Sequence, residues 1–222
     1  MGSKVISSLG LLNEHLAEYA AYFGVRPNDN HYGVPYPGSF ILDEQGRVVE
    51  KWFEAHHRYR PSPVAQLEKS FAGVSSRPLA RAEAEAGDVG VVASIGQDTY
   101  RPTQKLRLNL QVNLPPGLHI YGPPTAGDYT PLSVTLDPLE CLEMGPLELP
   151  PGRPFRLEGL AEELYVYEGA VRAALPFWLL GNVGEVVLTA RVRYQACSDR
   201  ECYPPAEVTV DLPLQGLDLV RG

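Results

Sequence analysis

The sequence predicts a mainly β protein in which a β-sandwich follows a smaller α+β piece at the N-terminus. From residue 88 onward, apolar and polar residues alternate in several short segments, as they do in half-buried strands. Before residue 73, one segment instead repeats its apolar residues every three or four positions, which is typical of a helix. Proline and glycine number 21 each, so we expect frequent turns and no long helical bundle.

The N-terminal piece, residues 1–72, is predicted to begin with a helix and a hairpin. Residues 4–23 carry apolar side chains at helical spacing. Two strands are predicted at residues 39–43 and 47–54. Gly46 in the connecting turn suits a position that needs a positive φ.

A second helix and a linker complete this piece. Ser62 and Pro63 are typical of an N-cap and of a first helical position. The expected buried face of this helix consists of Val64, Leu67 and Phe71. Residues 73–87 are small and polar without a core pattern, so they are predicted to be a linker to a second domain, residues 88–222.

The second domain is predicted to be a β-sandwich. Leu106, Leu108, Leu110 and Val112 alternate with polar residues, and so place four apolar side chains on one face of a strand. The same alternation recurs in three further segments, residues 132–136, 186–194 and 208–212. Turns rich in proline and glycine separate them, as is typical of a sandwich.

Composition argues against several functions. The chain has 19 basic and 27 acidic residues, a net charge of −8, so it would repel a phosphate backbone and nucleic acid is not an expected partner. Its most apolar stretch, residues 173–180, contains Pro176 and is far shorter than the ~20 apolar residues of a membrane-spanning helix. The first residues lack the apolar run of a signal peptide. We therefore expect a soluble chain without a transmembrane segment.

Cys197 and Cys202 are separated by four residues at the end of a predicted strand. A loop this tight can bring two Cα atoms within the ~4.4–6.8 Å that a disulfide needs. A disulfide stabilises less when it closes a short loop, which favours a redox pair over a structural staple. Spacing alone leaves the two interpretations about equal, and no further Cys or His cluster completes a zinc site. The third cysteine, Cys141, is expected to be a free, partly buried thiol.

The segments around this pair resemble the N-terminal domain of the thiol:disulfide interchange protein DsbD. Residues 194–205 contain Tyr-Gln-Ala-Cys followed by Cys-Tyr-Pro-Pro, similar to that family's active-site segment. Residues 114–121, 129–136 and 164–169 also fit the family, in the same order. The resemblance covers residues 88–214 and implies an immunoglobulin-like β-sandwich with one redox disulfide.

The resemblance also implies roles for individual residues. Cys202 would form the mixed disulfide with a partner, and Cys197 would resolve it by thiolate attack. The residues expected to line the site are His119, Tyr121, Glu163, Tyr165 and Tyr203. Of these, Glu163 and Tyr165 fall in the stretch that matches the family's flexible cap loop, residues 162–165. His119 replaces a plain aromatic residue; it could stabilise a thiolate if charged, although packing is its expected use.

Residues 32–50 resemble the second half of a thioredoxin-fold redoxin of the peroxiredoxin (AhpC/TSA) type. Pro37 matches the cis-proline of that fold. The reactive cysteine of such a redoxin precedes this part of the fold, and residues 1–72 contain no cysteine. The resemblance therefore implies a partial, truncated thioredoxin-like fold with no peroxidase activity of its own.

Three functions follow from these patterns. The first is thiol:disulfide oxidoreductase activity through the cysteine pair, with thioredoxin-fold partners and a membrane-embedded electron donor. The second is a non-enzymatic binding module with a structural disulfide, and the third is a fragment of a peroxiredoxin-type antioxidant enzyme. No cofactor is expected. No metal is expected either, because adjacent residues on a strand face opposite ways, so His56 and His57 cannot easily share one ion. The resemblance implies the periplasm; the cytoplasm is the alternative.

Overall fold

The computed structural model describes residues 38–53, 59–71, 79–124, 128–156 and 164–218. The chain divides into two compact units, Met1–Pro61 and Ser62–Gly222. The predicted helix at residues 4–23 and the predicted cis-proline, Pro37, lie outside the described residues.

The described part of the first unit is the predicted hairpin. Strand β1 (Gly38–Leu42) pairs antiparallel with β2 (Val48–Phe53), and the short β3 (Arg60–Pro61) ends the unit. Gly46 has the expected positive φ of 76°. The Asp43 carboxylate holds the turn because it accepts hydrogen bonds from the backbone N–H groups of Gln45 and Arg47, at 3.0 and 2.8 Å. The hairpin prediction is confirmed, while the thioredoxin-like fold of this part stays a prediction.

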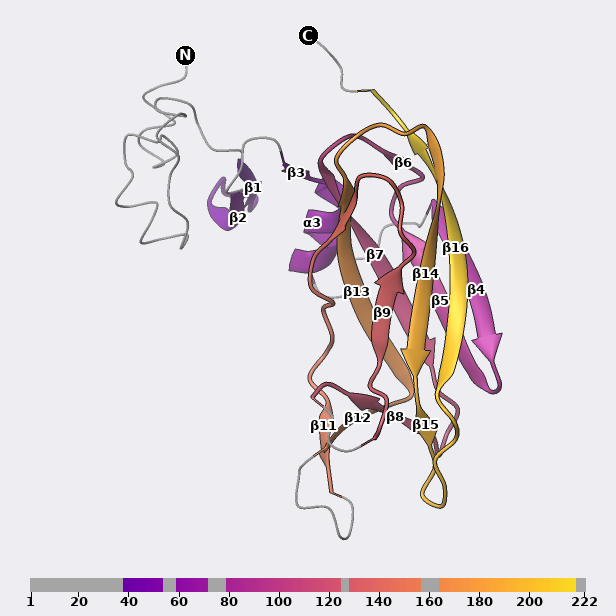
Figure 1. Ribbon diagram of the computed structural model, residues 1–222. Coiled ribbons are helices and arrows are strands. Elements are labelled where there is room, and N and C mark those ends of the chain that lie inside the picture. The colour runs from indigo at the N-terminus through magenta and orange to yellow at the C-terminus, as the bar shows by residue number, and fades with distance from the viewer. Residues whose placement is uncertain (1–37, 54–58, 72–78, 125–127, 157–163, 219–222) are drawn as a thin grey trace, which may run out of the picture. The chain divides into compact units, whose positions relative to one another are not determined.

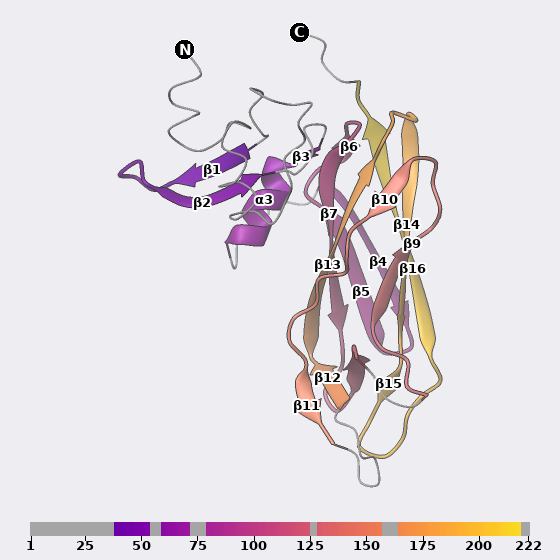
Figure 2. The same ribbon diagram turned by 60° about the vertical axis from the view of Figure 1, so that its left-hand side comes forward.

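The second unit is a β-sandwich built from two large sheets (Figure 1, Figure 2). The first sheet has the order β10 (Leu142–Met144), β13 (Ala170–Leu179), β7 (Gln104–Asn113), β5 (Val89–Ile95) and β4 (Ala80–Ala86). The second has the order β6 (Thr99–Tyr100), β16 (Ala206–Gly216), β14 (Glu185–Tyr194) and β9 (Ser133–Leu136). A small third sheet has the order β11 (Arg153–Phe155), β12 (Leu164–Glu168), β8 (His119–Gly122) and β15 (Ala196–Cys197).

Alternating side chains form the core between the two large sheets. The four apolar residues predicted on one face of β7 are all buried, with Leu108 at 0 % exposure. Their partners on β13 pair in register from Ala170↔Asn113 to Phe177↔Leu106. Strands β14 and β16 bury every second residue in the same way. The β-sandwich prediction is confirmed.

The predicted linker is wrong for residues 80–86, which form strand β4. This strand pairs with β5 along its length, and its exposed charged residues alternate with alanines that pack against the core. Ala80 is only 4 % exposed. The prediction failed because alanine and glutamate are weak strand formers and the inward side chains are too small to make an apolar pattern.

Helix α3 (Pro63–Ser70) begins where predicted, but it belongs to the second unit and its contacts differ from those expected. Leu67 and Phe71 are not buried; they are 43 % and 36 % exposed. The helix contacts β7 through that strand's outward, polar face. There the Asn109 amide donates a hydrogen bond to the Glu68 carboxylate at 2.8 Å. Of the three residues expected on the apolar face, only Val64 is partly buried, and polar contacts to the sheet replace the other two.

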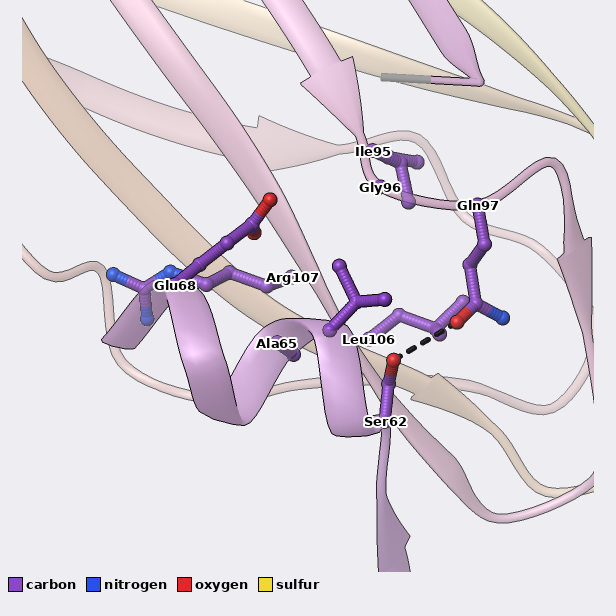
Figure 3. A pocket seen from close by; sticks show the side chains of 9 residues that line it. Ser62, Ala65, Glu68, Ile95, Gly96, Gln97, Leu106 and Arg107 are labelled. Carbon is purple, nitrogen blue, oxygen red and sulfur yellow. Dashed lines mark hydrogen bonds between the residues drawn. The ribbon is translucent and has the colours of Figure 1, made fainter. Parts of the chain in front are cut away.

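A pocket lies between α3 and strands β5 and β7 (Figure 3). Its lining consists of Ser62, Val64, Ala65, Glu68, Ile95, Gly96, Gln97, Leu106 and Arg107. The Ser62 side chain makes no N-cap hydrogen bond, contrary to the prediction; its hydroxyl donates to the Gln97 side-chain oxygen at 2.9 Å. No cysteine or histidine lines this pocket, so it is not a candidate for thiol chemistry.

Candidate functional site

The candidate site lies on the small third sheet, at one end of the sandwich (Figure 1). Because side chains alternate across a strand, this sheet has two different faces. One face joins the main core through Ile120, Tyr167 and Ala196. The other face forms a second, separate cluster, which consists of Tyr121, Leu164, Val166 and Cys197 with Tyr129 and Phe155 packed against it. One cysteine of the pair therefore lies in an apolar cluster outside the main core.

The two cysteines face each other across a tight hairpin. The Tyr203 N–H donates to the Ala196 carbonyl at 2.9 Å, and the Ser198 N–H donates to the Glu201 carbonyl at 2.8 Å. The cysteines lie between these two hydrogen-bonded pairs, where opposite Cα atoms of antiparallel strands approach most closely. Their Cα atoms are 4.0 Å apart and their sulfurs form a disulfide. The backbone of the hairpin thus holds the two sulfurs together.

The two sulfur-bearing residues differ in accessibility. Cys197 is 1 % exposed, whereas Cys202 is exposed. The turn between them is tied by the Ser198 hydroxyl, which accepts hydrogen bonds from the N–H groups of Arg200 and Glu201, both at 3.2 Å. Cys202 is therefore the more accessible residue of the pair.

Tyr121 contacts the exposed cysteine from the apolar cluster. Its hydroxyl lies 3.7 Å from the Cys202 sulfur, and its ring centroid lies 4.5 Å from that of Tyr129. Burial raises the pKa of Tyr121 to about 12, with a further contribution from Tyr129. The hydroxyl therefore keeps its proton at neutral pH, and it can donate a hydrogen bond to a Cys202 thiolate when the disulfide is reduced.

His119 is buried beside the disulfide. It is 5 % exposed and is the cross-strand partner of Cys197 on β15. Its ring centroid lies 5.0 Å from that of Phe155 and 5.6 Å from that of Tyr121. Burial lowers the pKa of His119 below its usual 6.5. The imidazole is therefore neutral at pH 7 and packs between aromatic rings, so it does not supply the positive charge that would stabilise a thiolate.

A family model for the N-terminal region of the thiol:disulfide interchange protein DsbD matches residues 93–214, more than half of the chain. The chain belongs to this family. The DsbD N-terminal family passes reducing equivalents through a disulfide to thioredoxin-fold partners. The matched range includes both cysteines and the whole small sheet.

Solved structures of DsbD-type domains resemble the chain. The reduced DsbD N-terminal domain of Neisseria meningitidis is 19% identical, with a TM-score of 0.37, over 62% of this chain and 86% of that one. The N-terminal periplasmic domain of ScsB from Proteus mirabilis is 16% identical, with a TM-score of 0.44, over 59% of this chain and 49% of that one. This chain therefore spans about half the length of the ScsB domain.

A third structure is the complex of the DsbD and PilB N-terminal domains from Neisseria meningitidis, 17% identical with a TM-score of 0.36 over 59% of this chain and 79% of that one. A search of the curated proteins found no match. The assignment to the DsbD N-terminal family therefore rests on the family model.

The structure brings together only some of the residues that the resemblance to DsbD assigned to the site. Cys197, Cys202, His119 and Tyr121 meet on one face of the small sheet. Glu163 lies outside the described residues.

Three other residues lie away from the face that carries the disulfide. Tyr165 is in strand β12, not in a loop, and alternation places it on the face opposite to Leu164. Tyr203 is 43% exposed and pairs with the hairpin through its backbone. Cys141 is free, as predicted, but it is exposed, so the prediction of partial burial is wrong.

Sequence reasoning missed three residues that shape the site. Phe155 and Tyr129 complete the aromatic cluster. The Gln195 side chain accepts a hydrogen bond from the Thr130 N–H and donates one to the Tyr203 carbonyl, both at 3.0 Å. This amide ties the exit of the cysteine hairpin to the loop that carries Tyr129. Two signals could have found them: Gln195 is two residues before Cys197, and Tyr129 begins the stretch 129–136 that fits the family.

In the part of the chain that the structure describes, no group of three or more His, Cys, Asp and Glu side chains is arranged to hold a metal ion. No helix in the same residues has the length and apolar character needed to cross a membrane. The groups at the DsbD-type site are the disulfide with its exposed Cys202, the Tyr121 hydroxyl and the neutral His119 imidazole.

Proposed function

We propose that this chain transfers electrons by thiol–disulfide exchange, with Cys202 as the sulfur that bonds to the partner and Cys197 as the sulfur that releases it. The observation that carries the proposal is the pairing of an exposed Cys202 with a buried Cys197 in the family's active-site segment. Exchange requires one sulfur that a partner can reach and a second that stays beside it.

The backbone of the hairpin supports a redox role over a structural one. Hydrogen bonds flank the cysteine pair on both sides, from Ala196 to Tyr203 and from Ser198 to Glu201. The strands can therefore stay paired when the disulfide opens. A disulfide that closes a loop this short also adds less stability than one that closes a long loop. In the chain-entropy model the amount here is about 2 kcal/mol. The disulfide is thus not needed to hold the hairpin together.

The exchange proceeds in two displacements. The Cys202 thiolate attacks a disulfide sulfur of the partner, which forms a mixed disulfide and frees the partner's other sulfur as a thiolate. The Cys197 thiolate then attacks the Cys202 sulfur, re-forms the Cys197–Cys202 bond and releases the second partner sulfur. Two electrons pass to the partner, which takes up two protons to become a dithiol. A dithiol donor restores the chain by the reverse steps.

Family membership supports thioredoxin-fold proteins as the partners and a membrane-embedded protein as the electron donor. It also supports the periplasm as the compartment, because a disulfide pair is maintained there and the cytosol keeps thiols reduced.

The reduction potential of the pair tests this function. We expect a value above about −300 mV, since structural disulfides lie below that value. The measurement is an equilibrium titration in dithiothreitol and glutathione buffers, read by alkylation and intact mass. The Cys141→Ser background is needed because Cys141 is an exposed free thiol. A value below −300 mV would favour the binding module with an inert disulfide.

We propose in addition that the first unit, residues 1–61 of the predicted 1–72, belongs to a redoxin segment of the AhpC/TSA type. The hairpin of β1 and β2, with Gly46 in its turn, supports this. Residues 1–72 contain no cysteine, so the purified chain is expected to consume no peroxide with dithiothreitol as reductant. Peroxide turnover that persists in a variant without Cys141, Cys197 and Cys202 would contradict this.

A further inference from the structure

Four residues form a row across the small sheet beside the disulfide. Glu168 on β12 is the register partner of His119 on β8, and His119 is the partner of Cys197 on β15. Cys197 in turn pairs with Cys202 on the returning strand of the hairpin. Directly opposed residues in antiparallel strands point to the same face, with Cβ atoms about 4.5–5.5 Å apart. The row therefore places the His119 side chain between those of Cys197 and Glu168 on one face of the sheet.

The imidazole in this row has a polar atom without a partner. The Nε2 atom of His119 is buried and has no hydrogen-bond partner among the described residues. A buried polar atom left unpaired is destabilising, so such an atom calls for an explanation. Cys197 carries no hydrogen while it is in the disulfide. Reduction gives it an S–H group, which is a donor that the oxidised protein lacks.

We infer that His119 is the general base that takes the proton from Cys197 when the mixed disulfide is resolved. This inference rests on the proposed exchange function. The Cys197 S–H bond breaks and its proton moves to His119 Nε2. The resulting thiolate attacks the Cys202 sulfur, the Cys197–Cys202 bond forms, and the bond from Cys202 to the partner breaks. The partner leaves as a thiolate and takes up a proton, either from the imidazolium or from water.

Burial and the charges around His119 keep its imidazole neutral, which is the form that can accept a proton. Burial, the largest effect, lowers its pKa, and Arg153 on β11 lowers it further. Glu168 on β12 and Asp199 in the cysteine turn act in the opposite direction. Tyr121 on the same strand keeps its proton because its own pKa is about 12. The imidazole is therefore neutral at pH 7, and the two carboxylates stabilise the imidazolium that forms when it accepts a proton.

Glu168 acts through His119 and is a positioning residue. It forms an ion pair with Arg153 and lies at the exposed end of the row. Its negative charge raises the pKa of His119. Glu168→Gln should therefore shift the pH dependence of the resolving step to lower pH and leave the step in place.

The resolving step can be followed with the aromatic disulfide 5,5′-dithiobis(2-nitrobenzoate). The reduced full chain, in the Cys141→Ser background, releases one thionitrobenzoate when Cys202 attacks the reagent. It releases a second when Cys197 attacks the resulting mixed disulfide. A thiol with pKa near 8.5 is only about 3% thiolate at pH 7, so loss of the base should slow the second release by about 10- to 30-fold in His119→Phe.

The pH profile separates a base from a packing residue. In the unsubstituted chain, the second release should be nearly constant from pH 7 to 8. In His119→Phe it should rise about tenfold per pH unit, because the thiolate must then form without help. The first release serves as an internal control and should stay within about twofold. An unchanged second release, or a loss that is equal at every pH, would overturn the role of His119.

One result distinguishes failure of this inference from failure of the proposed exchange function. If the unsubstituted chain releases only one thionitrobenzoate, the exchange function fails and not merely the role of His119.

If His119→Phe does not fold, the role of His119 is tested instead by a nitrogen NMR titration of His119 in the unsubstituted chain. The His119 pKa should be lower in the reduced protein than in the oxidised one, because the Cys197 S–H group donates a hydrogen bond to the neutral imidazole and so disfavours the imidazolium. Identical titration curves in the two redox states would overturn the inference.

Discussion

Replacing Cys202 by serine is expected to abolish covalent capture of a thioredoxin-fold partner, whereas Cys197→Ser is expected to accumulate the mixed disulfide. The reason is the difference in accessibility: Cys202 is exposed, and Cys197 is 1 % exposed within the apolar cluster. Without Cys202, no reachable sulfur remains in the pair. Without Cys197, the bond between Cys202 and the partner forms and the chain has no second thiolate to cleave it. The mixed disulfide therefore accumulates when the reaction is quenched with acid before the partner's own freed thiolate reverses the capture.

The measurement is intact mass after each reduced variant is mixed with an oxidised thioredoxin. Both variants are made in the Cys141→Ser background, since Cys141 is a free exposed thiol and would form adducts of its own. Equal capture by the two variants would contradict the assigned roles. A variant without either cysteine that still binds the partner as tightly as the unsubstituted chain would favour a binding module.

Ala80→Asp is expected to lower the free energy of unfolding of the sandwich by about 2–4 kcal/mol. Ala80 is 4 % exposed and belongs to the main core at the start of β4. A carboxylate at this position would be buried among apolar side chains. A residue in a linker would tolerate the same change, so the variant tests whether residues 80–86 are part of the sandwich.

The neighbouring residue provides a matched control. Leu79 is 61 % exposed, so Leu79→Asp should change the free energy of unfolding by no more than about 0.5 kcal/mol. Urea unfolding can be followed by the fluorescence of Trp178 on β13, in the Trp52→Phe background that removes the other tryptophan. If both variants unfold at the same urea concentration, β4 does not contribute to the fold.

Patterns within one segment were enough to predict much of the fold. Alternation identified the buried face of β7, and glycine at position 46 identified the turn of the first hairpin. Such signals are local, because neighbouring residues of one strand decide them. Such patterns failed to predict β4, because its inward residues are alanines and give no apolar alternation. They also failed at Leu67, which is exposed because the helix contacts a polar face of the sheet.

The sequence by itself determined the cysteine pair, its hairpin and the family to which the surrounding strands belong. The tertiary structure decided that Cys202 is the accessible sulfur, that Tyr121 contacts it, and that Glu168, His119 and Cys197 lie in one row. Glu168, His119 and Cys197 are far apart along the chain and come together only through the register of β12, β8 and β15. Register between distant strands depends on how whole sheets pack, so no local pattern could have paired His119 with Cys197.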